Sequence, residues 1–432
     1  MRNVLAFIGF VLAIAVVGCG GQPSGPKSDP ISITPQEAKG NSNPAKLPTE
    51  GQNAERAKET PAPSTTPAHV PSPSPSPNAS PIPTPTPTGD IVFVRDGNLW
   101  LGYVRDGRQV PLTMDGNNSS PKWSVDGRWV LFVHSKGSGS ELQVIGADGS
   151  GRHQLVGGGS PYSGALYSDP IWSPKGDAIL FTATRDTNKD GKLDERDVSE
   201  VWLVSADGSN LRKLAEGRDP AWSPEGLRVA FATLGKLDNE VPYRRDNGID
   251  VINREGKNEW TLVSTSRVPG EITLGGYKFG SGVFLIDKPA WSPTSKLVSL
   301  TAIGHTGMVL TITDKASDLR PWGMNYEGGF GRSVWSPHGE LLAYESYPPS
   351  GVSEIVVGSP DVPRLVAIGG VRTGLSVNSP TWSPDGKYLA FVQESGTRFI
   401  GVVGADGQGL RQLATGNVSE PDWSPKGATG GN

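Results

Sequence analysis

The chain has 432 residues, including 57 glycines, 38 prolines and a single cysteine, and its formal net charge at pH 7 is −4. On length alone it could hold two or three domains. The chain is mildly acidic and has no cluster of Lys and Arg, so it lacks the usual features of a nucleic-acid-binding protein. One cysteine excludes an intrachain disulfide.

Residues 1–18 have the pattern of a secretory signal peptide. Met1-Arg2-Asn3 supplies a positive start, and Val4 to Val17 is an apolar run of fourteen residues. A helix that spans a membrane needs about 20 apolar residues, so the run has the length of a signal peptide. The alternative is an uncleaved N-terminal anchor helix.

The run ends in Val16-Val17-Gly18-Cys19, which resembles the bacterial lipobox. This resemblance implies that the thiol of Cys19 is lipidated and that the mature chain begins there. We therefore expect an extracytoplasmic protein anchored to a bacterial membrane through Cys19, either in the periplasm or at the cell surface. In the alternative of an uncleaved helix, Cys19 is incidental.

Residues 19–88 have the composition of a tether. They are rich in Pro, Ser, Thr and Gly and poor in large apolar side chains, so they cannot bury enough surface to offset the entropy cost of ordering. The alternation of Pro with small residues over 71–77 and 81–87 favours extended polyproline II conformations. We predict a disordered, semi-rigid spacer without a binding role.

Residues 89–432 contain an internal repeat. A Trp-Ser pair occurs seven times, and six of the seven pairs continue with Pro. The repeated tryptophans are Trp123, Trp172, Trp222, Trp291, Trp335, Trp382 and Trp423. We expect these side chains to pack in the core, because a ligand-stacking role for all seven is the less economical interpretation.

Each repeat encodes short antiparallel strands. Ser383-Pro384-Asp385-Gly386 is typical of a type I turn, and Tyr388 to Phe391 then reads as a buried strand. Asp-Gly pairs such as Asp207-Gly208 lie between later apolar runs, which indicates a second hairpin. Four strands per repeat make one blade of a β-propeller.

The spacing of the tryptophans predicts the number of blades. Successive intervals are 49, 50, 69, 44, 47 and 41 residues, and blades usually take about 40–50. The longest interval predicts an insert near 266–285. The chain opens in mid-repeat and closes with the start of another, so pairing its ends completes a composite blade and gives seven.

This pattern resembles the TolB-like propeller repeats, also called PD40 or WD40-like repeats. The resemblance covers about 89–427 and implies an all-β propeller. It does not specify function, because such propellers serve as protein-binding modules, as non-catalytic domains of prolyl-oligopeptidase-like enzymes and occasionally as enzymes. TolB itself has six blades and an additional α/β domain, whereas this sequence predicts seven and no such domain.

The segment from Asp186 to Asp197 matches the twelve-residue calcium loop of the EF-hand. The expected ligands are Asp186, Asn188, Asp190, Lys192 through its carbonyl, Asp194 and Asp197. Asp197 stands where an EF-hand has Glu, and its shorter side chain makes bidentate ligation harder. Strand-like runs flank the loop, so we expect a structural Ca²⁺ between two strands of one blade. The alternative is a solvated acidic turn.

No catalytic motif was found, and the sequence assigns no catalytic residue. Of the four histidines in the repeats, His153 and His338 have the context of surface turns, whereas His134 and His305 are candidates for a central funnel site. We expect a monomeric binding scaffold for a protein, peptide or glycan, without nucleic acid, and not an enzyme. The alternative is a propeller enzyme, lyase or hydrolase-like, with its active site in the funnel.

Overall fold

The computed structural model describes residues 90–426 except 194–195, 238–243, 246, 275–276, 281, 327, 360–361, 363–365 and 371–372. The predicted signal peptide, Cys19 and tether therefore lie outside the described residues, as does the calcium candidate Asp194. Within the described ranges, no helix is long and apolar enough to cross a membrane.

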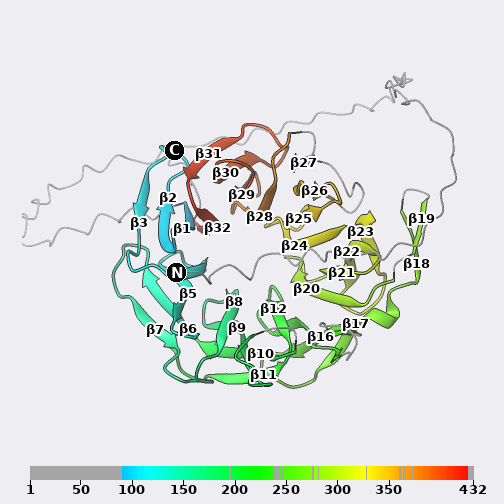
Figure 1. The fold of residues 1–432 in the computed structure, drawn as a ribbon, viewed down its shortest axis with the longest axis horizontal. Helices are drawn as coiled ribbons and strands as arrows, with labels where there is room; N and C mark the ends of the chain where they lie inside the picture. Colours follow the sequence, from blue (N-terminus) through cyan, green and yellow to red (C-terminus); the bar gives the residue numbers. More distant parts are fainter. Residues whose placement is uncertain are drawn as a thin grey trace, which may run out of the picture. The chain divides into compact units, whose positions relative to one another are not determined.

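Seven four-stranded antiparallel sheets are arranged as blades around a common centre (Figure 1). Each sheet is ordered from an inner to an outer strand. Blade 1 consists of β32 (Val418–Trp423), β1 (Ile91–Arg95), β2 (Asn98–Gly102) and β3 (Gln109–Pro111). Blades 2 and 3 follow as β4 (Asn118–Trp123), β5 (Trp129–Lys136), β6 (Gly139–Gly146), β7 (His153–Val156), and β8 (Leu166–Trp172), β9 (Ala178–Arg185), β10 (Val198–Ser205), β11 (Arg212–Glu216).

The remaining blades repeat this meander. Blades 4 and 5 are β12 (Arg218–Trp222), β13 (Arg228–Ala232), β16 (Gly248–Asn253), β17 (Trp260–Ser264), and β20 (Leu285–Trp291), β21 (Leu297–Ile303), β22 (Thr306–Thr313), β23 (Arg320–Tyr326). Blades 6 and 7 are β24 (Gly329–Trp335), β25 (Leu342–Tyr347), β26 (Glu354–Gly358), β27 (Val366–Gly369), and β28 (Val377–Trp382), β29 (Tyr388–Gln393), β30 (Phe399–Gly404), β31 (Arg411–Thr415). The predicted count of seven blades is confirmed.

The ring closes through the two ends of the repeat region. The last strand, β32, pairs with the first, β1, in the register Ile91 to Trp423 and Arg95 to Val418. The C-terminal strand thus supplies the inner strand of a blade whose other three strands come from the N-terminal end. The predicted composite blade is confirmed, and β32 pairs with the edge of β1 that would otherwise be exposed.

The Trp-Ser turns join the inner strand of a blade to its second strand. In the described turns the amide of the fourth residue donates to the Ser carbonyl, as Gly386 does to Ser383 at 2.9 Å. The fourth residue has a positive φ, +70° at Gly386, which favours glycine. Blade 5 departs from this rule, because Ser295 adopts φ 58° where the other turns have Gly.

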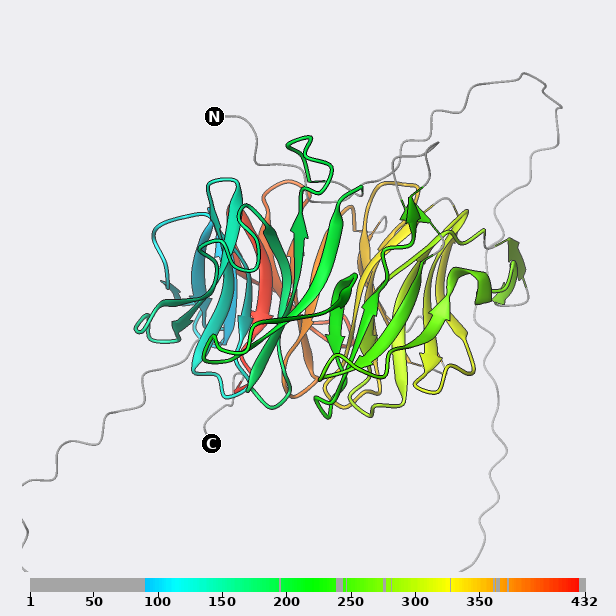
Figure 2. The same cartoon turned by 90° about the horizontal axis from the view of Figure 1, so that it is seen from below.

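Antiparallel alternation gives the propeller two unlike ends. We call the turn face the end where the first strand of a blade meets its second and the third meets its fourth. We call the loop face the opposite end, where the second strand meets the third and each blade meets the next. The loop face is at the top of Figure 2, and the turn face is at the bottom.

Extra residues gather on the loop face in the long interval of the repeat. One insert, η1 (Thr265–Arg267) and the hairpin β18 (Glu271–Leu274) with β19 (Tyr277–Gly280), lies between blades 4 and 5, where the sequence predicts it. A second insert, with β14 (Lys236–Leu237) and β15 (Arg244–Arg245), lies between β13 and β16. The sequence interval could not separate them, because both fall between the same two tryptophans.

The core lies between neighbouring blades. One cluster joins Leu99 and Leu101 of blade 1 to Trp123 and Phe132 of blade 2, and similar clusters follow around the ring. Six of the seven repeat tryptophans are buried, and Trp172 is half-buried. The indole N–H of Trp382 donates to the carbonyl of Val334 in the preceding blade at 3.0 Å. The predicted packing role of these side chains is confirmed.

Candidate functional site

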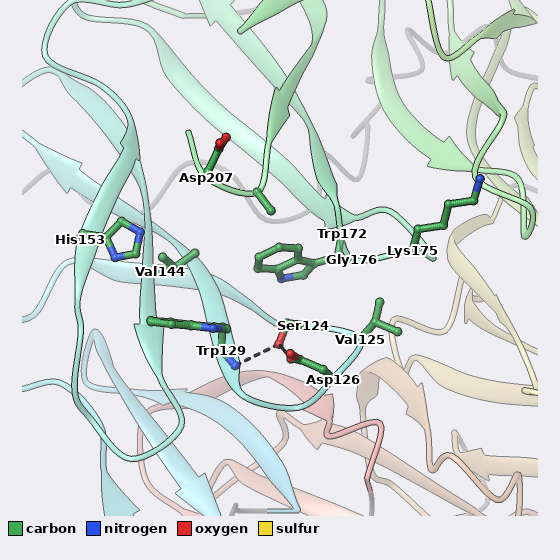
Figure 3. Close-up of a pocket in the computed structure, with 11 residues that line it drawn as sticks. Ser124, Val125, Asp126, Trp129, Val144, His153, Trp172, Lys175, Gly176 and Asp207 are labelled. Carbon is green, nitrogen blue, oxygen red and sulfur yellow. Dashed lines mark hydrogen bonds between the residues drawn. The ribbon is translucent and has the colours of Figure 1, made fainter. Parts of the chain in front are cut away.

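A groove opens on the turn face between blades 2 and 3 (Figure 3). Its volume is about 510 Å³, and Trp129 and Trp172 both contribute to its lining. The edge of His153 packs against Trp129, with ring centroids 5.8 Å apart and planes at 84°. Sequence analysis treated Trp172 as one of seven packing residues, and only the structure shows that its ring also lines a groove.

The inner strands also share a bulge, and in five of the seven blades its residue is charged. In six of the seven inner strands, the residue three positions before the repeat tryptophan has a φ between +51° and +54°. These residues are Ser120, Asp169, Asp219, Lys288, Ser379 and Glu420, and each precedes a proline. Arg332 holds the same position in blade 6 without the proline.

Arg332 bridges the channel. Its guanidinium pairs with Asp169 of blade 3 and, at 3.2 Å, with Asp219 of blade 4. Arg332 is on β24 of blade 6, which is adjacent to neither blade 3 nor blade 4. These ion pairs between inner strands therefore cross the centre of the ring. The Arg332 side chain is 46% exposed, so water reaches the bridge. The recurring x-Pro-x-Trp pattern marks Asp169 and Asp219 in the sequence, whereas Arg332, which lacks the proline, carries no such signal.

The carboxylates of the channel perturb one another. Burial and the nearby charge of Asp169 raise the pKa of Asp219 to about 6, and Arg332 opposes the shift. The charge of Asp169 is the main reason that the pKa of Arg332 is raised. Asp219 can therefore take up a proton under mildly acidic conditions while Arg332 stays charged.

Two further carboxylates bind bulge amides across blade boundaries. Glu420 of blade 1 accepts from the Ser120 amide of blade 2 at 2.6 Å, and Glu345 of blade 6 accepts from Ser379 of blade 7 at 2.7 Å. Burial raises the pKa of Glu420. Tyr347 donates to Glu345 at 2.7 Å. The first contact joins two inner strands, and the second joins β25 to the inner strand of blade 7, so both connect neighbouring blades.

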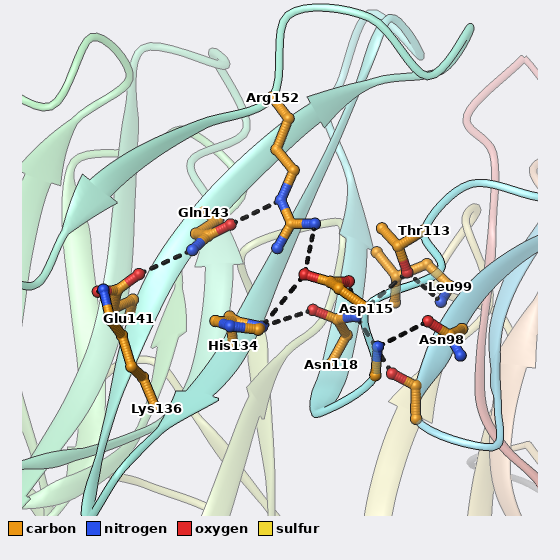
Figure 4. Close-up of polar contacts among 12 residues, drawn as sticks. Asn98, Leu99, Thr113, Asp115, Asn118, His134, Lys136, Glu141, Gln143 and Arg152 are labelled. Carbon is orange, nitrogen blue, oxygen red and sulfur yellow. Dashed lines mark hydrogen bonds and ion pairs between the residues drawn. The ribbon is translucent and has the colours of Figure 1, made fainter.

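The two histidine candidates for a funnel site lie elsewhere. His134 is on β5, and its Nδ1 lies 3.0 Å from Asn118 Oδ1 and 3.9 Å from Asp115 Oδ2 (Figure 4). Arg152 extends this network between blades 1 and 2, pairing with Asp115 at 2.8 Å. His305 is exposed in the connection between β21 and β22. Neither joins the carboxylates of the channel among the described residues, so the convergence that would favour an enzyme site in the funnel is not seen at either histidine.

The expected turn positions of the other two histidines are confirmed. His153 and His338 are exposed, His153 at the start of β7 and His338 in the Trp-Ser turn of blade 6. His153 has the additional contact with Trp129 described above.

The predicted calcium loop connects β9 to β10 on the loop face, as the flanking strands indicate. The amide of Gly191 donates to Asp186 Oδ2 at 2.8 Å, and Gly191 adopts φ 77°. Asn188 Oδ1 accepts from the amide of Asp190 at 2.9 Å. The loop therefore curls around the carboxylate of Asp186.

The two ends of this loop are joined by a hydrogen bond beside the blade. Asp197 is 2% exposed, and its Oδ1 accepts from the Thr187 amide at 2.9 Å. Oδ1 of Asp186 is buried and has no hydrogen-bond partner. Asp190 Oδ1 accepts from the amide of Lys192 at 2.9 Å. Counting described residues alone, which leaves out Asp194, no group of three His, Cys, Asp or Glu is placed to hold a metal.

Comparison with known proteins gives partial matches. No family model matches the chain. It is 28% identical over 175 residues to the uncharacterized peptidase YuxL of Bacillus subtilis, covering 33% of this chain and 26% of the relative. It is 31% identical over 109 residues to the Tol-Pal system protein TolB of Gluconobacter oxydans, covering 23% of each chain. The chain thus spans about a quarter of the length of these curated relatives.

Solved structures share the fold. An oligogalacturonate lyase from Vibrio parahaemolyticus matches with a TM-score of 0.51 and 12% identity, covering 76% of this chain and 87% of the lyase. At this identity the likeness shows the fold alone. The seven blades with their repeated Trp-Ser turns establish that the chain forms a seven-bladed β-propeller, and part of its sequence is similar to TolB.

Proposed function

We propose that this propeller is a binding scaffold held outside the cytoplasm by a lipid on Cys19, and that it engages a protein, peptide or glycan through its loop face. The observation that supports this function most is the distribution of long connections. Segments 157–165, 186–197, 233–247 and 265–284 all belong to the loop face, and they lie on consecutive blades from 2 to 5. Long surface loops on a rigid frame commonly carry recognition residues.

The channel supports the same proposal. Arg332 pairs with Asp169 and Asp219 across the channel. These two carboxylates are therefore already paired, whereas catalysis in the funnel would need carboxylates free to act on a substrate. The similarity to a Tol-Pal system protein also favours a protein partner, whereas the similarity to a peptidase and a lyase keeps catalysis as the competing function.

Site-specific photocrosslinking can test the loop face. Cys19 is the only natural cysteine, so a thiol-reactive photoprobe can be directed to a new one. We would compare His305→Cys on the loop face with His338→Cys on the turn face, because both histidines are exposed. The proposal predicts adducts from position 305 in intact cells and few from 338. Equal adducts, or adducts from 338 alone, would contradict it.

The anchor has its own test. Cys19→Ser should release the protein from the membrane fraction, because the lipid has no attachment site. A Cys19→Ser protein that stays with the membranes would show that the apolar segment itself is the anchor.

We also propose that the loop from Asp186 to Asp197 binds a structural Ca²⁺. The unpartnered, buried Oδ1 of Asp186 supports this proposal, since a buried carboxylate oxygen normally has a donor or a cation. The candidate ligands are Asp186, Asn188, Asp190, the Lys192 carbonyl, Asp194 and Asp197, all supplying the oxygens that Ca²⁺ prefers.

Calorimetry distinguishes this proposal from a solvated acidic turn. Ca²⁺ at 100 times its dissociation constant should stabilise the fold by about 2.7 kcal/mol, and chelator should remove the gain. Asp190→Asn should weaken the response, whereas Asp207→Asn, in an exposed turn of the same blade, should retain it. A melting temperature indifferent to Ca²⁺ and chelator would exclude the ion.

A further inference from the structure

The groove on the turn face lies where the repeat departs from its own pattern. Residue 125 is Val, where six repeats have Pro, and it is 47% exposed. Trp172 is the half-buried member of the seven repeat tryptophans, and Trp129 of the preceding blade faces the same space (Figure 3). The next two blade interfaces, between blades 3 and 4 and between blades 4 and 5, show one way in which this space is filled.

At those two interfaces an arginine of the chain covers the repeat tryptophan. The Arg254 guanidinium lies 5.6 Å from the ring of Trp222, and Arg228 lies 4.6 Å from the ring of Trp291. Each arginine is also held by a carboxylate: Asp177 pairs with Arg254 at 2.9 Å, and Glu225 pairs with Arg228 at 2.9 Å. The turn face thus uses a repeated combination of indole, guanidinium and carboxylate.

At the groove, the positions equivalent to these two arginines are occupied by residues without a guanidinium group. Ala206 is equivalent to Arg254, since each opens the turn between the third and fourth strands and donates to a carbonyl near the Trp-Ser turn, at 3.0 and 2.9 Å. Trp129 is equivalent to Arg228, since each lies six residues after a repeat tryptophan. Among the described residues, no Arg or Lys lies over the ring of Trp172.

The groove does retain carboxylates. Burial opposes ionisation of Asp126, but hydrogen bonds from Ser124 and Arg128 lower its pKa to about 2. The hydrogen bond from Ser209 lowers the pKa of Asp207. Both groups are therefore ionised at neutral pH. The ammonium of Lys175 points away from the indoles, toward the next blade (Figure 3).

We propose that this groove binds the guanidinium group of an arginine side chain presented by a partner protein. The guanidinium takes the place over Trp172 that Arg254 and Arg228 take over their tryptophans. Asp207, whose Oδ1 accepts from Ser209 at 2.9 Å, has Oδ2 available for an ion pair. Trp129 supplies a second aromatic surface for the aliphatic part of the side chain. This site is independent of binding at the loop face.

The test compares a charged ligand with its neutral isostere. The full chain, labelled with 5-fluorotryptophan, would be titrated with N-acetyl-arginine amide and with N-acetyl-citrulline amide. The fluorine signals of Trp129 and Trp172, assigned from single Phe substitutions, should shift with the arginine compound. Because a desolvated cation–π contact is worth about 2 kcal/mol, citrulline should bind about tenfold or more weakly. Equal binding of the two compounds, or shifts caused only by a proline-rich peptide or an oligosaccharide, would overturn the proposal.

Three variants use the arginine positions of blade 4 as a control. Ala206→Arg should place a guanidinium over Trp172 and abolish binding of the arginine compound, whereas Ala206→Gln should retain it. Arg254→Ala should uncover Trp222 and add a second set of ligand-dependent shifts. Melting temperatures would show that each variant is folded. Unchanged binding by Ala206→Arg would refute the assignment of the site to the face of Trp172.

Discussion

The turn face and the loop face are built from the same strands, yet they differ in how strictly the repeat governs them. On the turn face, the Trp-Ser turns close with nearly the same hydrogen bond, 2.8 to 2.9 Å in blades 2 to 7, and the indoles of Trp172, Trp335 and Trp382 donate to carbonyls of the preceding blade. On the loop face, neighbouring connections differ widely in length and carry inserts in blades 4 and 5. Packing between blades constrains the first face, whereas chain connectivity alone constrains the second.

The largest expected effect follows from removing a tryptophan beneath the turn face. Trp382→Ala should lower the free energy of unfolding by about 3–5 kcal/mol, because the ring is 7% exposed and packs between blades. Denaturant unfolding would measure the loss. The control, Tyr388→Ala, removes an aromatic ring that is 47% exposed and should cost less than about 1 kcal/mol. Similar losses for the two variants would mean that the turn face is not under stronger packing constraint.

The channel that joins the two faces should respond to pH. The pKa of Asp219 is raised from 3.8 to about 6 by burial and by Asp169, with Asp287 adding to the shift and Arg332 and Arg218 opposing it. The folded state therefore binds more protons than the unfolded state between these values, so this group makes stability fall as pH rises through that window. Asp219→Asn removes this downward contribution, so the unfolding free energy of the variant should rise relative to that of the unaltered protein as pH increases from about 4 to 6. Parallel profiles for the two proteins would contradict the shift.

A smaller effect concerns the turn that departs from the rule. Gly386→Ala should cost about 1–2 kcal/mol, because φ of +70° is unfavourable for a residue with a Cβ. Ser295→Gly should relieve the same strain but lose the hydrogen bond from Ser295 Oγ to Glu225, 2.7 Å long. We expect the two terms to offset and the melting temperature to stay nearly unchanged. A clear gain would show that the bond to Glu225 contributes little.

The smallest effect is expected on the loop face. Replacing 271–280, the hairpin β18–β19, with a short Gly-Ser turn should change the free energy of unfolding by less than about 1 kcal/mol. In the described structure its two strands pair with each other and form a sheet separate from the blades. Thermal unfolding would measure the change. A large loss of stability would show that the hairpin belongs to the frame rather than to the variable face.

The sequence by itself determined the repeated frame. The Trp-Ser turns, the strand-like runs and the incomplete repeats at the two ends predict seven blades and a composite closure, because these features depend on local turn chemistry and on a short period. The same local reasoning places the acidic loop from Asp186 to Asp197 between β9 and β10. It could not show that Asp186 Oδ1 is buried without a partner, since burial depends on the rest of the blade.

Only the tertiary structure decided which residues meet across blades. Asp169, Asp219 and Arg332 lie far apart in the chain, and they converge because the inner strands of three blades surround one channel. His134 and His305 carry no local signal that distinguishes a funnel from a blade interface or an exposed loop, so only the structure could place them. At the groove beside Trp172, Ala206 and Trp129 hold the positions that Arg254 and Arg228 hold in blade 4. The shared hydrogen bonds of the turns, which only the structure shows, reveal the first of these equivalences.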